Sequence, residues 1–263
     1  MTQHYFSVGA IFKNEGHILE EWINHYKFHG IDHIYLIDDH STDLYKDKLQ
    51  KYIDEKYVTL YCDDIDNEKR WLGMQEFKYN KYFKPIINES KWFGIFDLDE
   101  FLYSPKCINV TEILKKHEHC GQINIDWLNF GSSDHVPQPK FVVPNFLYRG
   151  EYNSQKNGAS GMYNSYKSIV QSHEKTSLGV HQHHNAKYDK LINCSFNFEN
   201  PELLINHYSV QSKDFYLNIK CTRGDVNYYY DAMKYERNLA MFDSMDTNEV
   251  YDTTLYDQNK HLY

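Results

Sequence analysis

The acidic run Asp97-Leu98-Asp99-Glu100 directly follows the apolar stretch KWFGIF at 91–96. Asp97 and Asp99 flank one residue, so a bend after a strand can bring both carboxylates, or one carboxylate and a water held by the other, onto one divalent ion. Mg²⁺ and Mn²⁺ prefer oxygen ligands and often complete their coordination with substrate phosphates. Acidic triplets are also common in surface loops. The position after an apolar strand favours a metal site that binds a diphosphate.

Two other polar clusters also follow apolar stretches. Asp38 and Asp39 come after HIYLI, where a carboxylate can accept hydrogen bonds from a base or a ribose. Capping of the next helix is the alternative, because the helix dipole favours acids there. Lys13-Asn14-Glu15 follows YFSVGAIF and is equally compatible with a simple turn before the first helix.

His207 ends the apolar run LLIN and is followed by a basic segment that contains Lys213, Lys220 and Arg223. Arginine offers a planar fork to phosphate and lysine a point charge, so the segment can face a diphosphate. A buried, satisfied histidine and a solvated helix face are the alternatives. His181 and His183 alternate onto one strand face beside His184, but without a further ligand in view they do not favour zinc.

These residues need a scaffold that brings them together, and the hydrophobic pattern supplies one. Apolar runs alternate with helical periodicity through the first hundred residues, and this order is typical of a mostly parallel sheet covered by helices. The expected strands are 5–12, 33–37, 58–62 and 91–96, and the expected helices are 18–29, 42–53 and 69–83. In such sheets ligands bind beyond the carboxyl ends of the strands, so all three clusters are expected on one rim.

The alternation weakens after residue 103. Further strands are expected at 122–130, 167–170, 178–181 and 203–210, with a Gly-Ser loop at 131–134 after the first of them. We expect one α/β domain over residues 1–225 and a short helical, acidic tail over residues 226–263.

Composition narrows the class of protein. A formal charge of −9 over 263 residues argues against a nucleic-acid-binding surface, which is usually basic. No apolar stretch approaches the roughly 18 residues that span a bilayer, and the N-terminus turns polar too soon for a signal peptide. Five widely spaced cysteines without a CxxC pair argue against a disulfide framework or a structural zinc site. These features favour a cytoplasmic protein with at most peripheral membrane association.

Several stretches together resemble the glycosyltransferase family 2-like and family 92 group, which has the GT-A fold, a Rossmann-like α/β fold. The matching stretches, in the order of that group, are KNEGHILEEWINHYKFHGIDHIYLIDDHSTD (13–43), Gln75, WFGIFDLDEFLY (92–103), WLNFGSS (127–133), KSIV (167–170) and HYSVQSKDFYLNIKCTRG (207–224). The resemblance implies a glycosyltransferase with a nucleotide-sugar donor, usually a UDP-sugar, a divalent metal such as Mn²⁺ or Mg²⁺, and a glycan or lipid-linked saccharide acceptor.

The resemblance also assigns roles to residues. It implies metal binding by Asp97, Asp99 and His207, with Asp97 acting directly or through water or ribose. The donor-binding set is Lys13, Glu15, Asp39, Gln75, Asp97, Lys213, Lys220 and Arg223.

The general base is expected after the strand that follows the metal motif. An inverting transferase needs a carboxylate that removes the acceptor hydroxyl proton. WxxFGSS is commonly followed by Gly-His in the group, whereas this chain has Asp134-His135. We therefore predict Asp134 as the base, with Asp126 and Glu151 as rivals and simple turn chemistry as the alternative.

Two other functions compete with this hypothesis. Asp97 and Asp99 resemble the aspartate pair of haloacid-dehalogenase-type phosphatases, but those enzymes carry the pair at the first strand rather than the fourth. A non-catalytic module that binds nucleotide sugars is the other alternative.

Overall fold

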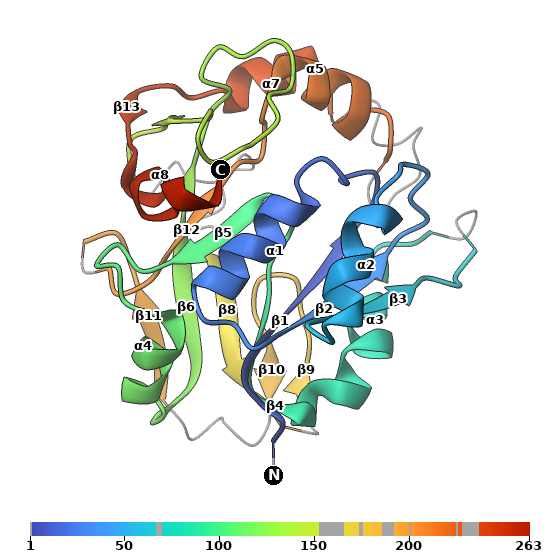
Figure 1. The fold of residues 1–263 in the computed structure, drawn as a ribbon, viewed down its shortest axis with the longest axis vertical. Helices are drawn as coiled ribbons and strands as arrows, with labels where there is room; N and C mark the ends of the chain where they lie inside the picture. The colour runs from blue at the N-terminus through green and yellow to red at the C-terminus, as the bar shows by residue number, and fades with distance from the viewer. Residues whose placement is uncertain are drawn as a thin grey trace.

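The computed structural model describes residues 2–66, 70–152, 166–173, 176–185, 192–199, 201–224, 226–227 and 237–263. Its centre is a nine-stranded sheet in the order β3-β2-β1-β4-β8-β6-β12-β5, with β11 also paired to β6. Helices cover the sheet (Figure 1). The expected α/β class with a mostly parallel sheet is confirmed.

The first half of the chain alternates as its hydrophobic pattern predicts. The elements are β1 (His4–Phe12), α1 (Leu19–Phe28), β2 (His33–Asp38), α2 (Lys46–Asp54), β3 (Val58–Cys62), α3 (Met74–Tyr82), the 3₁₀ turn η2 (Lys84–Glu89) and β4 (Ser90–Ile95). All four strands pair in parallel.

Side chains of β2 alternate between two hydrophobic cores. Ile34 and Leu36 lie in the core that contains α1 and α2 residues, whereas Tyr35 and Ile37 pack with residues of α3 and η2. The period of two along a strand therefore places helices on both faces of this half of the sheet.

The second half adds strands of both directions. They are β5 (Glu100–Tyr103), β6 (Cys120–Asn129), β8 (Tyr166–Gln171), β11 (Ile192–Phe196) and β12 (Leu204–His207). β6, β11 and β12 run parallel to one another, whereas β8 is antiparallel to both β4 and β6, and β5 is antiparallel to β12. β8 thus joins the two halves of the sheet (Figure 1).

Smaller elements complete the described chain. They are α4 (Val110–Lys116), β7 (Tyr148–Arg149), β9 (Thr176–Ser177), β10 (His184–Asn185), α5 (Lys213–Phe215), the π-turn η3 (Tyr216–Lys220), α7 (Leu239–Met245), β13 (Val250–Tyr251), α8 (Thr254–Asn259) and η4 (Lys260–Leu262). The strand expected at 178–181 is wrong. The backbone N–H and carbonyl of Leu178 pair with the side-chain amide of Asn80, and these bonds replace a strand partner.

The C-terminal residues pack onto the α/β body. Leu255 is buried in the main core, and Arg149 pairs with Asp252 at 2.8 Å. Asn259 lies 2.9 Å from the ring of His25 in α1 and 2.9 Å from the ring of His29, the residue that follows α1. The end of the chain therefore contributes to the packing of the sheet and its helices.

The expectation that the cysteines form no disulfide is wrong for one pair. Cys120, at the start of β6, is joined to Cys194 of β11, and Cys62, Cys107 and Cys221 are free. Seventy-four residues separate the pair, so only the pairing of β11 with β6 brings the sulfurs together.

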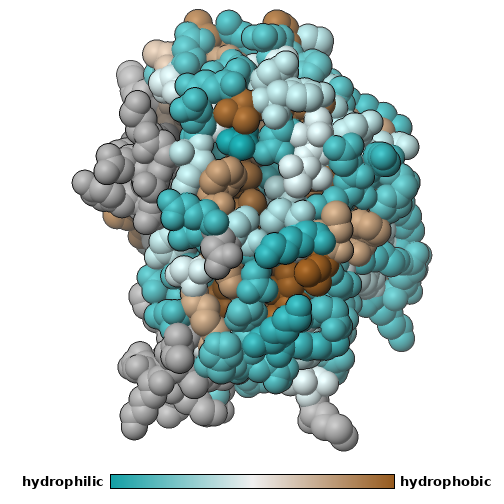
Figure 2. All heavy atoms as spheres, turned by 90° about the vertical axis from the view of Figure 1, so that its left-hand side faces the viewer, coloured by the Kyte–Doolittle hydropathy of each residue, from teal (hydrophilic) through white to brown (hydrophobic). Residues whose placement is uncertain are grey.

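The surface gives little sign of a large apolar contact on the face toward β11 and α4. That face is mostly hydrophilic, and its hydrophobic surface is divided into separate patches (Figure 2). Among the described residues, no helix combines the length and the hydrophobicity needed to cross a membrane.

Candidate functional site

A cavity of about 300 Å³ lies at the carboxyl ends of β1, β2, β4 and β12. Its volume is at the lower end of the usual range for small-molecule sites. Nine residues that the sequence nominates for donor or metal binding line it: Lys13, Glu15, Asp39, Gln75, Asp97, Asp99, His207, Lys220 and Arg223. The expectation that separate polar clusters share one rim therefore agrees with the structure.

The turn Asp97–Glu100 is braced from inside the protein. The Asp97 backbone N–H donates to Glu100 Oε2 at 3.0 Å, and the Glu100 N–H donates to the Asp97 carbonyl at 2.9 Å. Trp22 of α1 donates its indole N–H to both the Asp97 and the Glu100 carbonyls, at 3.1 and 3.0 Å. Glu100 is buried, and burial raises its pKa well above the usual range. Glu100 thus shapes the turn, and the carboxylates of Asp97 and Asp99 are left to line the cavity.

Each of these two aspartates has a lysine on one oxygen. Lys167, buried at the start of β8, donates to Asp97 Oδ2 at 3.0 Å, and Lys220 donates to Asp99 Oδ2 at 2.6 Å. Burial raises the pKa of Asp99, but the Lys220 ammonium and His207 outweigh it and hold that pKa well below its usual value. Asp99 is therefore a carboxylate at neutral pH, and in both aspartates the lysine hydrogen bond goes to Oδ2 rather than Oδ1.

Asn129 fixes the orientation of the His207 ring. Its Oδ1 lies 3.0 Å from His207 Nδ1, and the two residues are paired in register where β6 and β12 end. Burial lowers the pKa of His207 to about 4, so the ring is neutral at pH 7. A neutral ring that donates Nδ1–H to Asn129 presents the lone pair of Nε2 to Asp99 Oδ1, 3.6 Å away.

These atoms fit a divalent ion. The 3.6 Å between His207 Nε2 and Asp99 Oδ1 is too long for a hydrogen bond, and it brings two lone pairs face to face. A cation between them removes that conflict, because ligands of one Mn²⁺ or Mg²⁺ each lie about 2.1 Å from it. Asp97 lines the same cavity.

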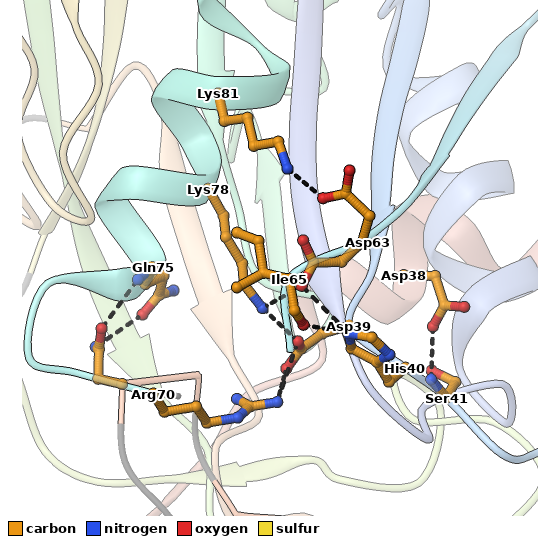
Figure 3. Close-up of polar contacts among 12 residues, drawn as sticks. Asp38, Asp39, His40, Ser41, Asp63, Ile65, Arg70, Gln75, Lys78 and Lys81 are labelled. Atoms are coloured by element: carbon orange, nitrogen blue, oxygen red, sulfur yellow. Dashed lines mark hydrogen bonds and ion pairs between the residues drawn. The ribbon is translucent and has the colours of Figure 1, made fainter. Parts of the chain in front are cut away.

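Asp39 belongs to a buried charge network shown in Figure 3. Lys78 of α3 is fully buried, with Nζ 2.5 Å from Asp39 Oδ1 and 2.6 Å from Asp63 Oδ2. Arg70 reaches the other Asp39 oxygen at 2.9 Å. Asp39, His40 and Asp63 could by spacing alone hold a metal, but the Lys78 ammonium already lies between the two carboxylates. The structure thus favours Asp39 as a positioned acceptor rather than a metal ligand.

The neighbouring Asp38 has a different role. Its Oδ1 accepts the Ser41 N–H at 2.8 Å, and its Oδ2 accepts the Tyr45 hydroxyl at 2.6 Å. The two aspartates therefore have different roles. Asp38 stabilises the turn, whereas Asp39 lines the cavity.

The cations of the cavity differ in how they are paired. Arg223 binds Glu15 at 3.0 Å and the Lys13 carbonyl at 2.8 Å, which ties the basic segment to the loop after β1. Within the described residues, the Lys13 ammonium makes no hydrogen bond or ion pair. Burial, then the charge of Arg70, lowers the pKa of Lys13. An anionic ligand can therefore pair with the Lys13 ammonium without displacing a protein partner.

Two predicted residues lie outside the cavity lining. The Lys213 ammonium lies 5.9 Å from the centroid of the Phe242 ring. Asp134 is exposed, in the loop that follows β6, with a left-handed φ of 60°. Of its rivals, Glu151 is exposed, and Asp126 accepts the Tyr152 hydroxyl at 2.6 Å.

The sequence predictions missed Lys167, Lys78, Arg70 and Asn129. KSIV (167–170) and WLNFGSS (127–133) are among the stretches that carry the family resemblance, so Lys167 and Asn129 had a signal. Lys78 and Arg70 show none beyond residue type. His181 lines the same cavity, and the His183 Nδ1 accepts the Gly179 N–H at 3.3 Å. The side chain of His184 lies outside the described residues.

Comparison with known proteins adds a family. The sequence model of glycosyltransferase family 92 matches residues 3–254, which extends 30 residues beyond Gly224, where the quoted stretches end. No curated protein matches the chain at a significant level.

Similarity to solved structures is slight. A crystal structure of S. aureus TarS with UDP has a TM-score of 0.38 and 18% identity, and covers 51% of this chain and 38% of that one. The same protein with UDP-GlcNAc has a TM-score of 0.37 and 19% identity, over 51% of this chain and 37% of that one. The chain thus spans well under half the length of these proteins, and at these TM-scores the likeness carries no argument about function.

Proposed function

The chain belongs to glycosyltransferase family 92, and we propose that it transfers a sugar from a nucleotide-sugar donor to a hydroxyl of a glycan or lipid-linked acceptor, with a GT-A fold and a divalent metal. One observation carries the proposal. Acids from the ends of β1, β2 and β4 and cations from the segment after β12 meet in one cavity. That arrangement matches a ligand that has both an anionic and a hydrogen-bonding part.

We position the donor in the cavity by matching its charged groups with side chains of opposite charge. We assign the diphosphate to Lys13, Lys220 and Arg223, of which Lys13 has no competing partner among the described residues. Asp39, held by Lys78 and Arg70, accepts hydrogen bonds from the base or ribose, and a UDP-sugar is the donor we favour. Asp99, His207 and Asp97 would hold Mn²⁺ or Mg²⁺, and a bound ion would neutralise the charge that develops on the departing nucleoside diphosphate.

The acceptor side depends on a base. We propose that Asp134 removes the proton from the acceptor hydroxyl, which then attacks the anomeric carbon opposite the diphosphate, so that the transfer inverts configuration. Its exposure in the loop after β6 leaves it reachable by a large acceptor. Asp134→Asn should retain donor binding and lose transfer. If the Asp134→Asn variant transfers sugar normally while the Asp126→Asn or the Glu151→Gln variant does not, the base is Asp126 or Glu151 instead.

Donor binding tests the proposed function itself. Titration calorimetry with Mn²⁺ and a panel of nucleotide sugars should show metal-dependent binding, followed by slow release of nucleoside diphosphate. Asp99→Ala should abolish the metal-dependent part. Asp64→Ala, which removes an exposed acid paired with Lys81, should change nothing. Binding without any turnover would favour a non-catalytic binding module, and no binding with or without metal would refute the proposal.

A further inference from the structure

A second group of metal-ligating side chains lies at the other end of the sheet. The ligand atoms of His117, His119, Cys120 and Cys194 all lie within 4.8 Å of one another. His117 follows the last turn of α4, Cys120 begins β6, and Cys194 comes from β11. Two thiolates and two imidazoles are a common ligand set of structural zinc sites.

The geometry of the histidines suits a metal. His117 Nε2 lies 3.1 Å from Glu202 Oε1, so a ring that donates there keeps Nδ1 for the cluster. Histidines that bind zinc usually donate their other ring N–H to a carboxylate or carbonyl in this way. The ring centroids of His117 and His119 are 5.8 Å apart, close to the roughly 5 Å expected for two imidazoles on one tetrahedral ion. His119 is exposed, so an ion can enter from solvent.

We propose that the reduced protein binds one Zn²⁺ through His117, His119, Cys120 and Cys194, and that this site alternates with the Cys120–Cys194 disulfide. A dithiol reductant donates two electrons to the disulfide and becomes a disulfide itself, and the two sulfurs take up two protons. Zn²⁺ then displaces both protons as the thiolates bind. In the reverse direction, a small-molecule disulfide accepts two electrons from the two thiolates and becomes a dithiol, the Cys120–Cys194 bond forms again, and the ion is released.

The location assigns the site a structural role. Cys120 and Asn129 are at opposite ends of β6, and nine residue steps of about 3.3 Å separate them by about 30 Å. In Figure 1, α4 and the start of β11 likewise lie toward the end of the sheet opposite the cavity. Either cross-link fastens β11 to the sheet, so the metal should affect stability and leave the donor site unchanged.

Zinc content and thiol count test the proposal. The full-length protein, without an affinity tag, is reduced with a dithiol, dialysed against Zn²⁺ without oxygen and analysed for metal by mass spectrometry. We expect one zinc per chain that protects two thiols from a thiol reagent, and a higher melting temperature with Zn²⁺ than without. His119→Ala, an exposed change that leaves the cysteines in place, should lower zinc affinity at least tenfold and abolish the thermal shift. Glu202→Gln should lower the affinity about 10–100-fold.

A matched control separates this site from adventitious binding. Cys62→Ser removes an exposed free cysteine elsewhere and should leave the zinc content at one per chain. If the reduced wild type takes up no stoichiometric zinc, or if His119→Ala and Cys194→Ser keep it, the proposal is wrong. If the cysteine variants do not fold, His119→Ala alone still decides.

Discussion

The buried lysine Lys78 offers a sharp test of how the Asp39 network is built. Lys78→Met keeps most of the aliphatic stem but removes an ammonium that lies 2.5 Å from Asp39 and 2.6 Å from Asp63. Removing one partner of a buried ion pair typically costs about 3–5 kcal/mol, since the other charge stays buried without compensation. Arg70 still holds Asp39, whereas Asp63 keeps no cation closer than the His40 ring at 3.4 Å, beside the neutral Tyr82 hydroxyl that donates to its Oδ1 at 3.0 Å. We therefore expect a loss of about 3 kcal/mol in the free energy of unfolding.

Lys81→Met is the matched control, because it lies one turn later on the same helix. Lys81 pairs with the exposed Asp64, and exposed pairs contribute about 0–1 kcal/mol. Equilibrium unfolding in urea, followed by tryptophan fluorescence, compares both variants with the wild type. Asp63→Asn combined with Lys78→Met should recover part of the loss, because the uncompensated charge is gone. If Lys78→Met and Lys81→Met lose the same small amount, Lys78 is not an essential buried counter-ion and the reasoning fails.

Three further changes test other parts of the structure. Asn129→Leu should weaken Mn²⁺ binding about 10–100-fold in calorimetry, because the ring of His207 loses the acceptor that orients it; unchanged affinity would remove Asn129 from this role. Burial lowers the pKa of His29 to about 4, below its unfolded value near 6.5, so its contribution to stability is complete above pH 6.5 and is lost as the pH falls toward 4. Between pH 7 and pH 4, the His29→Gln variant should therefore lose less unfolding free energy than the wild type, by up to about 3 kcal/mol, as measured by urea titrations at each pH. If both proteins lose the same amount, His29 is not held neutral in the folded protein. Leu255→Ala should cost about 2–5 kcal/mol because Leu255 is buried in the main core, whereas the half-exposed Leu239→Ala should cost less than about 0.5 kcal/mol; equal effects would mean that the end of the chain does not pack as described.

The sequence predicts the scaffold of the site better than its charge pairs. Val58–Cys62 is a strand with the predicted bounds, and β1, β2 and β4 each lie within a residue or so of the expected range. Buried parallel strands are short apolar runs bounded by polar residues, which is the strongest local signal in this chain. β5 was missed because Glu100–Tyr103 follows the acidic turn without a break and pairs only with the distant β12.

Burial of lysines could not be predicted from local pattern. Lys78 and Lys167 are residue types that usually face solvent, and they are buried here because acids from distant parts of the chain surround them. The same reason explains the Cys120–Cys194 pair, whose spacing follows no motif. Long-range pairing determines these features, and one sequence does not reveal it.

The reversed strand β8 has a consequence for how the protein folds. Trp92 of β4 pairs with Gln171, and Gln122 of β6 pairs with Val170. The inner strand of each half of the sheet therefore stays unpaired on one edge until residues that are synthesised much later become available. Contacts of such long sequence separation carry a high loop-closure entropy and slow the search for the native topology. Until β8 inserts, two strand edges stay open to pairing with other chains, as unpaired edges do. The cavity draws on both halves, so binding of the proposed donor would report completion of this slow step. A chaperone that shields the open edges should raise the yield of binding-competent protein.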